Sequence, residues 1–482
     1  MSKQEYFVDI HCHASYKAFN SGHPEPTESI WNSIQHNSAD KGIVRLIRQQ
    51  SQFVLKESQS DFTSLMNGKV RVVMVSLTPI EKGFLSWRRV SNMLLGNNSN
   101  EVIELLTGFS LPKIKYMVKA PDYYFSELVN EYNYIKNNQG KSPDGKRAYK
   151  IVNNYTELKD VVKNHPDTLA VIMSIEGGHL LGCGTEVSEK YSEKKLKEKL
   201  SENIQAIKNW EHPPFSLNLA HHFWNQLTGH ARSFKGPVWA LINQDKGVDK
   251  GLTEAGRHVI RELLSRKNGK RIIIDSKHLS IAARKEYYGF IRNYNYINPD
   301  DKIPVICSHT GMNGYKDMDS SIKLKDNNTK SRNQYLQKFS LNISAEEIRI
   351  IHESEGIIGL IMDKLVLGGG LAQQKIDKAA SPAKKKKEQM KLFWTNIFQV
   401  VMAVKSVTAW DIISIGSDYD GAITHFDSYP KSEHMPFLKR DLTDFLEETN
   451  FKKELWYDYT PRQLTNKIFR KNAMAFYKKH FI

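Results

Sequence analysis

Histidine and carboxylate side chains directly follow short apolar runs at widely separated positions of the sequence. The residues are His11, His13, Glu176, His221, His278, His309 and Asp418. Imidazole and carboxylate groups are the ligands that zinc and similar divalent ions take in proteins. A glutamate after a run of mostly apolar residues is costly to bury unless it is paired or bound to a cation. A buried site for divalent metal ions would account for all these positions together.

The spacing of His11 and His13 fits this chemistry, because residues two apart at a strand end point to the same face. Cys12 between them is expected to point into the layer between strand and helix as a small buried thiol. Each site residue also has a structural interpretation: a single histidine as a hydrogen-bonded core residue, and Asp418 as a helix N-cap. Nearly every strand would then need its own unrelated explanation, which favours the metal site.

Eight brief aliphatic or β-branched runs precede these residues and predict buried strands. They are Tyr6–His11, Val70–Leu77, Leu169–Glu176, Ser216–His221, Arg271–His278, Ile303–His309, Gly356–Met362 and Ile412–Asp418. Runs without alternation are typical of parallel strands covered on both faces. Amphipathic segments lie between most of them, so the sequence predicts a (β/α)8 TIM-like barrel, with a doubly wound open sheet as the rival fold. The carboxyl ends of barrel strands meet at one mouth, which would bring the chemical residues together.

Three helices have clear sequence signals. Ser344 and Glu347 form a capping box, and Thr460 followed by Pro461 is an N-cap with proline at the first helical position. A core-facing helical stripe is formed by Phe393, Ile397, Val400 and Val404.

The chain is expected to be a single barrel over residues 1–482, with insertions at about 80–165, 312–343 and 365–392. These stretches are long and polar. The run Ala379–Lys387, which ends in four lysines, is expected to be a solvated loop.

Composition narrows the classes of protein. With 482 residues, 40% hydrophobic and 25% charged, the chain is expected to fold rather than to be disordered. The net charge of +16 permits an anionic partner, but the lysines cluster in the insertions, so we expect no nucleic-acid partner. Three cysteines cannot form a disulfide framework. With no signal peptide and no transmembrane segment recognised, a cytoplasmic protein is predicted, and a homodimer is left open.

The order of motifs resembles the amidohydrolase superfamily and is most similar to its membrane (renal) dipeptidase family. The resemblance spans nearly the whole chain in colinear order and is concentrated at strand ends. It rests on H-x-H at His11, I-E-G-G-H at Ile175, L-x-L-x-H at Leu217, D-x-x-H-L-S at Asp275, P-V-x-x-S-H-T at Pro304, G-S-D-Y-D-G at Gly416, and further on Gly251–Arg257, Asn342–Ser344, Gly356–Gly359 and Asn472.

The resemblance implies a site for two metal ions, usually zinc. It implies that His11 and His13 bind the first ion, that His278 and His309 bind the second, and that Glu176 bridges both. It further implies that Asp418 contacts the metal-bound water and handles protons, while His221 lies over the developing oxyanion.

The sequence departs from the dipeptidase family at two positions. His13 stands where the family usually has aspartate, which removes one negative charge from the first metal site. Leu341 stands where the family has an arginine that pairs with the substrate's terminal carboxylate, and a leucine cannot make that contact. Arg332 or Lys338 could compensate from the same loop.

The function predicted from these features is hydrolysis of the amide bond of a dipeptide or similar small amide by a metal-bound hydroxide. A binuclear zinc dipeptidase-like enzyme acting on a small-molecule substrate is therefore expected. The alternatives are another amidohydrolase activity, such as lactone hydrolysis or deamination of a small metabolite, and a catalytically silent barrel that binds an anionic partner.

Overall fold

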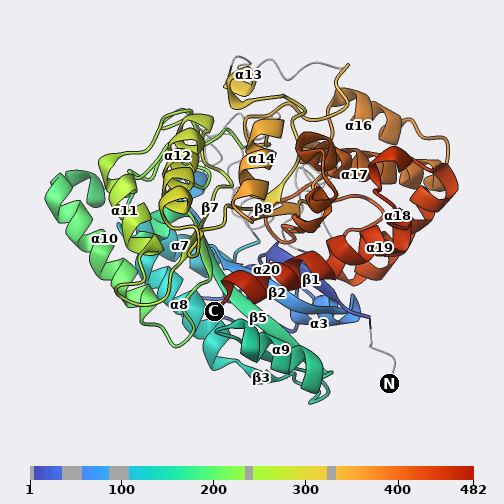
Figure 1. Ribbon diagram of the computed structural model, residues 1–482. Coiled ribbons are helices and arrows are strands. Elements are labelled where there is room, and N and C mark those ends of the chain that lie inside the picture. Colours follow the sequence, from blue (N-terminus) through green and yellow to red (C-terminus); the bar gives the residue numbers. More distant parts are fainter. Residues whose placement is uncertain (1–4, 35–56, 86–107, 234–242, 323–332) are drawn as a thin grey trace.

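Eight parallel strands joined by helices form the centre of the molecule (Figure 1). The computed structural model describes residues 5–34, 57–85, 108–233, 243–322 and 333–482. In order around the barrel the strands are β1 (Phe7–Cys12), β2 (Val70–Leu77), β5 (Thr168–Glu176), β6 (Ser216–Asn218), β7 (Ile273–Asp275), β8 (Ile306–Thr310), β9 (Ile357–Leu360) and β10 (Ile413–Ile415). Each neighbouring pair along this path is parallel, which confirms the predicted (β/α)8 barrel.

The first and last strands meet just above their carboxyl ends. The amide of Asp418 donates to the carbonyl of His11 at 2.9 Å, and the amide of His13 donates to the carbonyl of Tyr419 at 2.9 Å. The Asp9 side chain also accepts a hydrogen bond from the Ser417 amide at 2.9 Å. These contacts join the first and last strands of the barrel at its carboxyl end, where His11, His13 and Asp418 lie.

The eight predicted strands are all present, but four, β6, β7, β9 and β10, end earlier than the sequence suggested. β6, β7 and β10 stop before His221, His278 and Asp418, which therefore lie on the loops that follow. His278 and Asp418 have positive φ angles of 68° and 58°. A left-handed residue cannot continue an extended strand, so the backbone turns at these positions.

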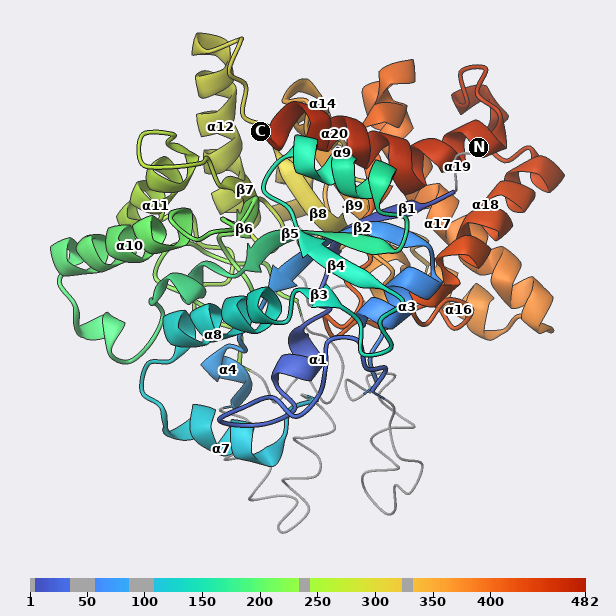
Figure 2. The same ribbon diagram turned by 90° about the horizontal axis from the view of Figure 1, so that it is seen from below.

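Helices surround the strands on all sides in the view from below (Figure 2). α10, α11 and α12 cover one side of the barrel, and α17 and α18 cover the opposite side. The helices are α1 (Tyr16–Phe19), α3 (Phe62–Asn67), α4 (Lys82–Leu85), α7 (Leu111–Lys119), α8 (Tyr124–Asn137), α9 (Tyr155–Asn164), α10 (Glu193–Lys208), α11 (Glu254–Leu264), α12 (Ile281–Ile297), α13 (Met318–Ile322), α14 (Ala345–Glu353), α15 (Lys364–Leu367), α16 (Gly370–Asp377), α17 (Pro382–Val404), α18 (Met435–Thr449), α19 (Pro461–Asn466) and α20 (Asn472–His480).

The capping predictions are confirmed. Ser344 and Glu347 make both hydrogen bonds of a capping box at the start of α14. Thr460 caps α19, with Pro461 in its first turn.

The expectation of a solvated loop at Ala379–Lys387 is wrong, because its lysines lie in the first turns of α17. Ser381 caps this helix and Pro382 is its first residue. Lys385 pairs with Asp427, and Lys386 pairs with Asp441 at 3.0 Å. The lysines of this basic helical segment thus form ion pairs with carboxylates that are distant in the sequence.

The segment predicted as the first insertion, about 80–165, contributes two strands that the sequence did not reveal. β3 (Gly140–Lys141) pairs antiparallel with β4 (Ala148–Ile151). β4 in turn runs parallel to the first half of β5, whereas the second half of β5 pairs with β6. Strand β5, the longest of the barrel, therefore carries two neighbours along one edge and ends at Glu176.

The amino-terminal end of the barrel is closed by apolar packing. Val8, Val72, Ile172 and Ile306 on four strands pack in one buried cluster with Phe476 and other residues of α20. A larger cluster fills the layer between strands and helices and contains the buried thiols of Cys12, Cys183 and Cys307. With apolar side chains filling one end, the buried polar groups gather at the other. None of the described helices has both the length and the apolar character required to cross a bilayer.

Candidate metal centre

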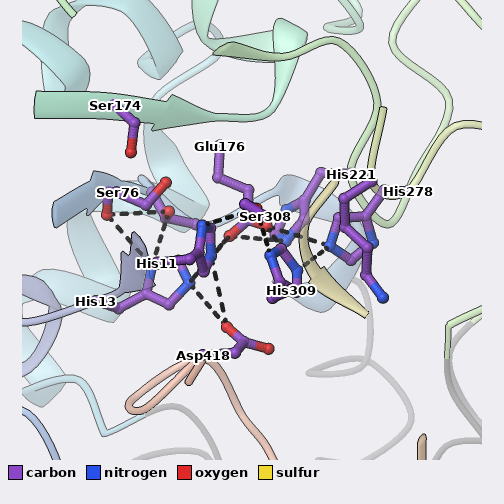
Figure 3. Close-up of polar contacts among 12 residues, drawn as sticks. His11, His13, Ser76, Ser174, Glu176, His221, His278, Ser308, His309 and Asp418 are labelled. Atoms are coloured by element: carbon purple, nitrogen blue, oxygen red, sulfur yellow. Dashed lines mark hydrogen bonds and ion pairs between the residues drawn. The ribbon is translucent and has the colours of Figure 1, made fainter. Parts of the chain in front are cut away.

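The structure brings all seven predicted site residues together at the carboxyl end of the barrel (Figure 3). They come from β1, β5 and β8 and from the segments that follow β1, β6, β7 and β10. All seven are buried, although four of them, His13, His221, His278 and Asp418, lie on the segments that follow the strands. This end is where the active sites of barrel enzymes are found.

Glu176 lies between two pairs of histidines and turns a different oxygen toward each pair. Its Oε2 atom lies 3.6 Å from Nε2 of His11 and 3.0 Å from Nε2 of His13. Its Oε1 atom lies 3.1 Å from Nε2 of His278 and 3.3 Å from Nε2 of His309. The pairs themselves are close, with Nε2 atoms 3.3 Å apart in the first and 3.1 Å apart in the second.

Asp418 completes the first half of the cluster. Its Oδ1 atom lies 3.2 Å from Nε2 of His13 and 3.6 Å from Nε2 of His11. The backbone of Asp418 is left-handed, and its amide donates to the carbonyl of His11. This conformation directs the carboxylate from the segment after β10 toward His11 and His13.

These spacings fit divalent metal binding. Ligand atoms about 2 Å from a tetrahedral zinc ion lie roughly 3.3 Å from one another. Ligand atoms converge within 4.8 Å in three groups: His11–Glu176–His309, His11–His13–Asp418 and Glu176–His221–His278. Imidazoles and carboxylates are the donor types that zinc accepts, so the residues present fit this ion.

The Nδ1 atoms of His11, His13 and His309 have partners that orient the rings. His13 Nδ1 donates to the carbonyl of Ser76 at 3.2 Å, with the Thr78 hydroxyl at 3.0 Å. The Ser308 hydroxyl lies 3.2 Å from His11 Nδ1 and 2.8 Å from His309 Nδ1. Such contacts fix ring orientation and direct Nε2 toward the centre, as is usual around bound metals.

His221 lies within the cluster rather than above it. Its Nε2 atom is 3.7 Å from Glu176 Oε2, and its Nδ1 atom is 2.9 Å from Oε2 of Glu81. Glu81 also accepts hydrogen bonds from the amides of His222 and Phe223 at 3.1 and 3.0 Å. The His221 ring is therefore held from behind by a buried carboxylate.

Burial and neighbouring charges shift the pKa values of this cluster. Burial opposes it, but His11, His221, His13 and His309 hold the pKa of Glu176 well below its ordinary value. Burial lowers the pKa of His13, yet Glu176 and Asp418 outweigh it and raise that pKa to about 10. Burial dominates at His278 and lowers its pKa to about 3 despite the contact with Glu176. The carboxylate of Glu176 is thus anionic, while the His278 ring is neutral and suited to donate a lone pair.

A small cavity of about 90 Å³ opens beside the cluster. Its polar lining includes Asp418, His278 and His309 of the cluster, and its apolar lining includes Leu341 and Phe339. Leu341 therefore occupies the site region, as the comparison of motifs suggested.

Lys338, one of the two residues named as a compensating cation, is not among the described residues that line this cavity. Lys338 places its ammonium 4.3 Å from the ring centre of Tyr315, and Arg332 lies outside the described residues. Lys277 does line the cavity. Burial lowers the pKa of Lys277, and Cys307, Asp418 and Glu176 oppose that shift.

Four residues with a part in this arrangement did not emerge from the sequence: Glu81, Thr78, Ser308 and Lys277. Ser308 directly precedes His309 within a quoted motif, and Lys277 directly precedes His278, so each had a local signal. Thr78 and Glu81 follow the buried strand β2, where polar residues were read as the start of an insertion.

The fold and the cluster together define a barrel protein with a buried set of histidine and carboxylate side chains that could hold a metal ion. The sequence matches no protein-family model and no curated protein. Three solved structures share the fold over nearly the whole chain. A dipeptidase described as a metallopeptidase of family M19 is 14% identical, with 99% of this chain and 98% of that chain covered and a TM-score of 0.52.

The second is the probable dipeptidase PvdM from Pseudomonas aeruginosa, with 11% identity, 99% and 95% coverage and a TM-score of 0.51. The third is a metallopeptidase from Rhodobacter sphaeroides bound to a phosphinate mimic of the dipeptide L-Ala-D-Ala. It has 14% identity, covers 98% of this chain and 99% of that chain, and has a TM-score of 0.54. This chain therefore has the fold of these dipeptidases.

Proposed function

We propose that the protein is a metal-dependent hydrolase that cleaves the amide bond of a dipeptide or a similar small amide. The observation that carries this proposal is the position of Glu176. Its two carboxylate oxygens face two separate histidine pairs, one per oxygen, at 3.0–3.6 Å. A carboxylate placed in this way can bridge two divalent ions, and zinc is the ion that the donor set fits first.

In this proposal His11 and His13 hold one ion, His278 and His309 hold the other, and Glu176 contacts both. When bound, the two ions would supply an activated water near neutral pH and polarise the scissile carbonyl. The serine and threonine partners of the Nδ1 atoms keep the histidines oriented for this task.

Asp418 is the proposed proton carrier. Its carboxylate lines the cavity and contacts the cluster through Oδ1, so it can reach both the proposed metal site and a ligand held in the cavity. It accepts a proton from the water and passes it to the leaving amine, which would otherwise depart as a poor, unprotonated leaving group.

His221 is the proposed donor to the developing oxyanion. Burial opposes it, but Glu81 and Glu176 raise its pKa above the ordinary value, which favours a protonated ring. A donor at this place is worth about 3 kcal/mol in enzymes from which one has been removed. Its 3.7 Å contact with Glu176 also places it near the ligands, so metal content is measured in every His221 variant.

The comparisons support a peptide-like substrate. The Rhodobacter sphaeroides metallopeptidase of the same fold binds a dipeptide mimic. Leu341 lines the cavity at the position where the dipeptidase family that the sequence resembles has arginine. This difference favours a change in how the substrate is bound rather than a change in the hydrolytic chemistry.

The first experiment counts metal in protein purified without chelator. Two equivalents of zinc or another divalent ion per chain are expected, because the cluster offers two sets of ligands. Well under one equivalent, not restored by added zinc, would overturn the binuclear proposal and favour a catalytically silent barrel.

The second experiment tests substrates on the zinc-loaded protein. The panel contains dipeptides with L- or D-residues at the C-terminal position, N-acyl amino acids, lactones and small aminated heterocycles. Turnover confined to the first two classes supports the proposed function. Turnover confined to lactones would assign lactone hydrolysis, and ammonia release from heterocycles would assign deamination.

A further inference from the structure

The cavity beside the metal-ligand cluster has one lysine whose ammonium group makes no hydrogen bond or ion pair with any described residue. Lys277 is only 1% exposed. Its Nζ atom is buried and makes no hydrogen bond with any described residue. Among the described residues that line the cavity, it is the only lysine or arginine.

The acidic residues of the cavity are already engaged. Asp363 accepts hydrogen bonds from the amides of Leu365 and Thr424 at 2.7 and 3.0 Å. Asp418 faces His13 at 3.2 Å. Neither carboxylate is hydrogen-bonded to Lys277, although both line the same cavity.

An unpaired buried ammonium is unfavourable, since burial removes its hydration and no hydrogen bond replaces the lost water. A methionine or leucine at this place would fold at lower cost. The fold does not need this lysine, and the lysine borders the candidate site. We therefore expect its ammonium group to bind a ligand.

Much of the rest of the cavity lining is apolar. This apolar part is formed by Phe339, Leu341, Ile361, Val366 and Ile423. A ligand that fills this space can therefore place one anionic group on Lys277 and an aliphatic or aromatic group on the apolar part of the lining.

We propose that Lys277 is the specificity-determining residue of the site and binds a carboxylate carried by the substrate, next to an apolar side chain that packs on Leu341 and its neighbours. The substrate class is then an amide formed on the nitrogen of an apolar amino acid with a free carboxylate. This inference rests on the proposed function and adds to it the residue that recognises the substrate. Lys338 does not take this role, because its ammonium lies over the Tyr315 ring outside the cavity.

The experiment compares two substrates that differ only in the anionic group, L-alanyl-L-leucine and L-alanyl-L-leucinamide. Both are assayed with the zinc-loaded wild type and with Lys277→Met. For the carboxylate substrate, kcat/KM is expected to fall about 10- to 100-fold in the variant, the range for one charge-assisted hydrogen bond. For the amide substrate the change is expected to be less than about threefold, because a neutral amide gains little from an ammonium.

Lys338→Met is the matched control. It removes a half-buried lysine from the neighbouring loop and is expected to leave the ratio of kcat/KM for the two substrates unchanged. Lys277→Met is also expected to bind as much zinc as the wild type and to unfold at the same or a higher temperature. A lower unfolding temperature together with an unchanged substrate ratio would mean a structural role and would overturn the proposal.

A separate measurement distinguishes failure of this inference from failure of the proposed function. If the wild type hydrolyses no member of the panel, the proposed function fails, and the subsite is tested by calorimetric titration of zinc-loaded protein with N-acetyl-L-leucine and its amide. Tighter binding of the carboxylate, lost in Lys277→Met, supports the carboxylate subsite. Equal binding of both probes, or equal affinities of wild type and variant, overturns it.

Discussion

Glu81 Oε2 lies 2.9 Å from Nδ1 of His221, so a carboxylate on the segment after β2 holds an imidazole on the loop after β6. Burial opposes ionisation, yet His221 and His179 lower the pKa of Glu81 to about 2. The buried Glu81 is therefore a fixed negative charge behind the His221 ring. It favours the protonated imidazolium, whose Nε2–H faces the cluster, 3.7 Å from Oε2 of Glu176.

We expect Glu81→Gln to lower kcat/KM about 10- to 100-fold, the usual effect of removing a group that orients a site histidine. Glutamine is nearly isosteric but carries no charge, so the proton on His221 is held less tightly. As the pH rises, activity should be lost at a lower pH than in the wild type, because the pKa of His221 is no longer raised by the Glu81 charge, while bound zinc stays the same. Glu254→Gln, which changes an exposed glutamate paired with Arg257 on α11, is the control. Unchanged kcat/KM in Glu81→Gln would contradict the positioning role.

Asp418→Asn separates proton transfer from metal binding. The residue has φ 58°, a left-handed conformation that asparagine tolerates better than most residues, so the fold should be kept. The amide cannot accept a proton from water, and kcat is expected to fall by about 100-fold or more. Bound zinc is measured in parallel. If zinc is lost together with activity, Asp418 is a ligand to the ion rather than the proton carrier.

Metal binding should stabilise the fold, since an ion that binds only the folded state adds its binding free energy to the free energy of unfolding. At a free zinc concentration 100 times the Kd, the gain is about 2.7 kcal/mol. We therefore expect chelator-treated protein to unfold at a lower temperature and added zinc to restore it. Glu176→Gln, which removes the charge shared by both histidine pairs, should respond much less to zinc. Identical unfolding curves with and without zinc would contradict a metal site in this cluster.

The barrel and its candidate site residues could be predicted from the points at which the apolar runs of the buried strands end. Each apolar run is followed by a polar group that cannot be buried without a partner, as at Glu176 and His309. Parallel strands place these ends at one mouth, so order along the chain was enough to predict their proximity.

The remaining features depend on contacts between segments distant in sequence. Glu81 gains its role only because the loop after β2 meets His221, and nothing near Glu81 announces that contact. The lysines of α17 looked like a solvated loop because their partners, Asp427 and Asp441, lie on later segments. Lys277 was visible in the sequence, but only the packed structure reveals that no described residue hydrogen-bonds its ammonium group.

Close packing beneath the cluster gives a test of stability. A Cβ atom added at Gly359 would lie 1.7 Å from the carbonyl oxygen of Ser308, and Cβ atoms do not approach backbone so closely. Gly359→Ala must therefore displace β8, which carries the Ser308 hydroxyl between His11 and His309. We expect a loss of about 1–3 kcal/mol in the free energy of unfolding and weaker zinc binding.

Gly289→Ala is the matched control for this variant. Gly289 lies within α12, and an added Cβ would meet no atom within 4 Å. Alanine favours the helix, so this change should raise the free energy of unfolding by about 0.5–1 kcal/mol. Urea unfolding of the wild type, Gly359→Ala and Gly289→Ala measures both changes in the free energy of unfolding. Equal stability of Gly359→Ala and the wild type would contradict the tight contact between β8 and β9.

His480, at the end of α20, should make stability depend on pH at a place outside the candidate site. Burial lowers its pKa to about 4, against an ordinary value of 6.5, although its Nε2–H donates to the carbonyl of Glu355 at 3.2 Å. The folded protein therefore binds the proton less tightly than the unfolded chain. Its contribution to the free energy of unfolding is complete above about pH 6.5 and is lost as the pH falls toward 4.

His480→Gln removes this titration while keeping a donor for the Glu355 carbonyl. Between pH 7.5 and pH 5 the wild type should lose about 2 kcal/mol more of its free energy of unfolding than the variant, as the difference between the two pKa values requires. Urea unfolding of both proteins at the two pH values measures this difference. Because the metal-ligand cluster is the same in both, its own titration cancels in the comparison. Parallel losses in the two proteins would show that His480 titrates normally and that the end of α20 is open to water at acidic pH.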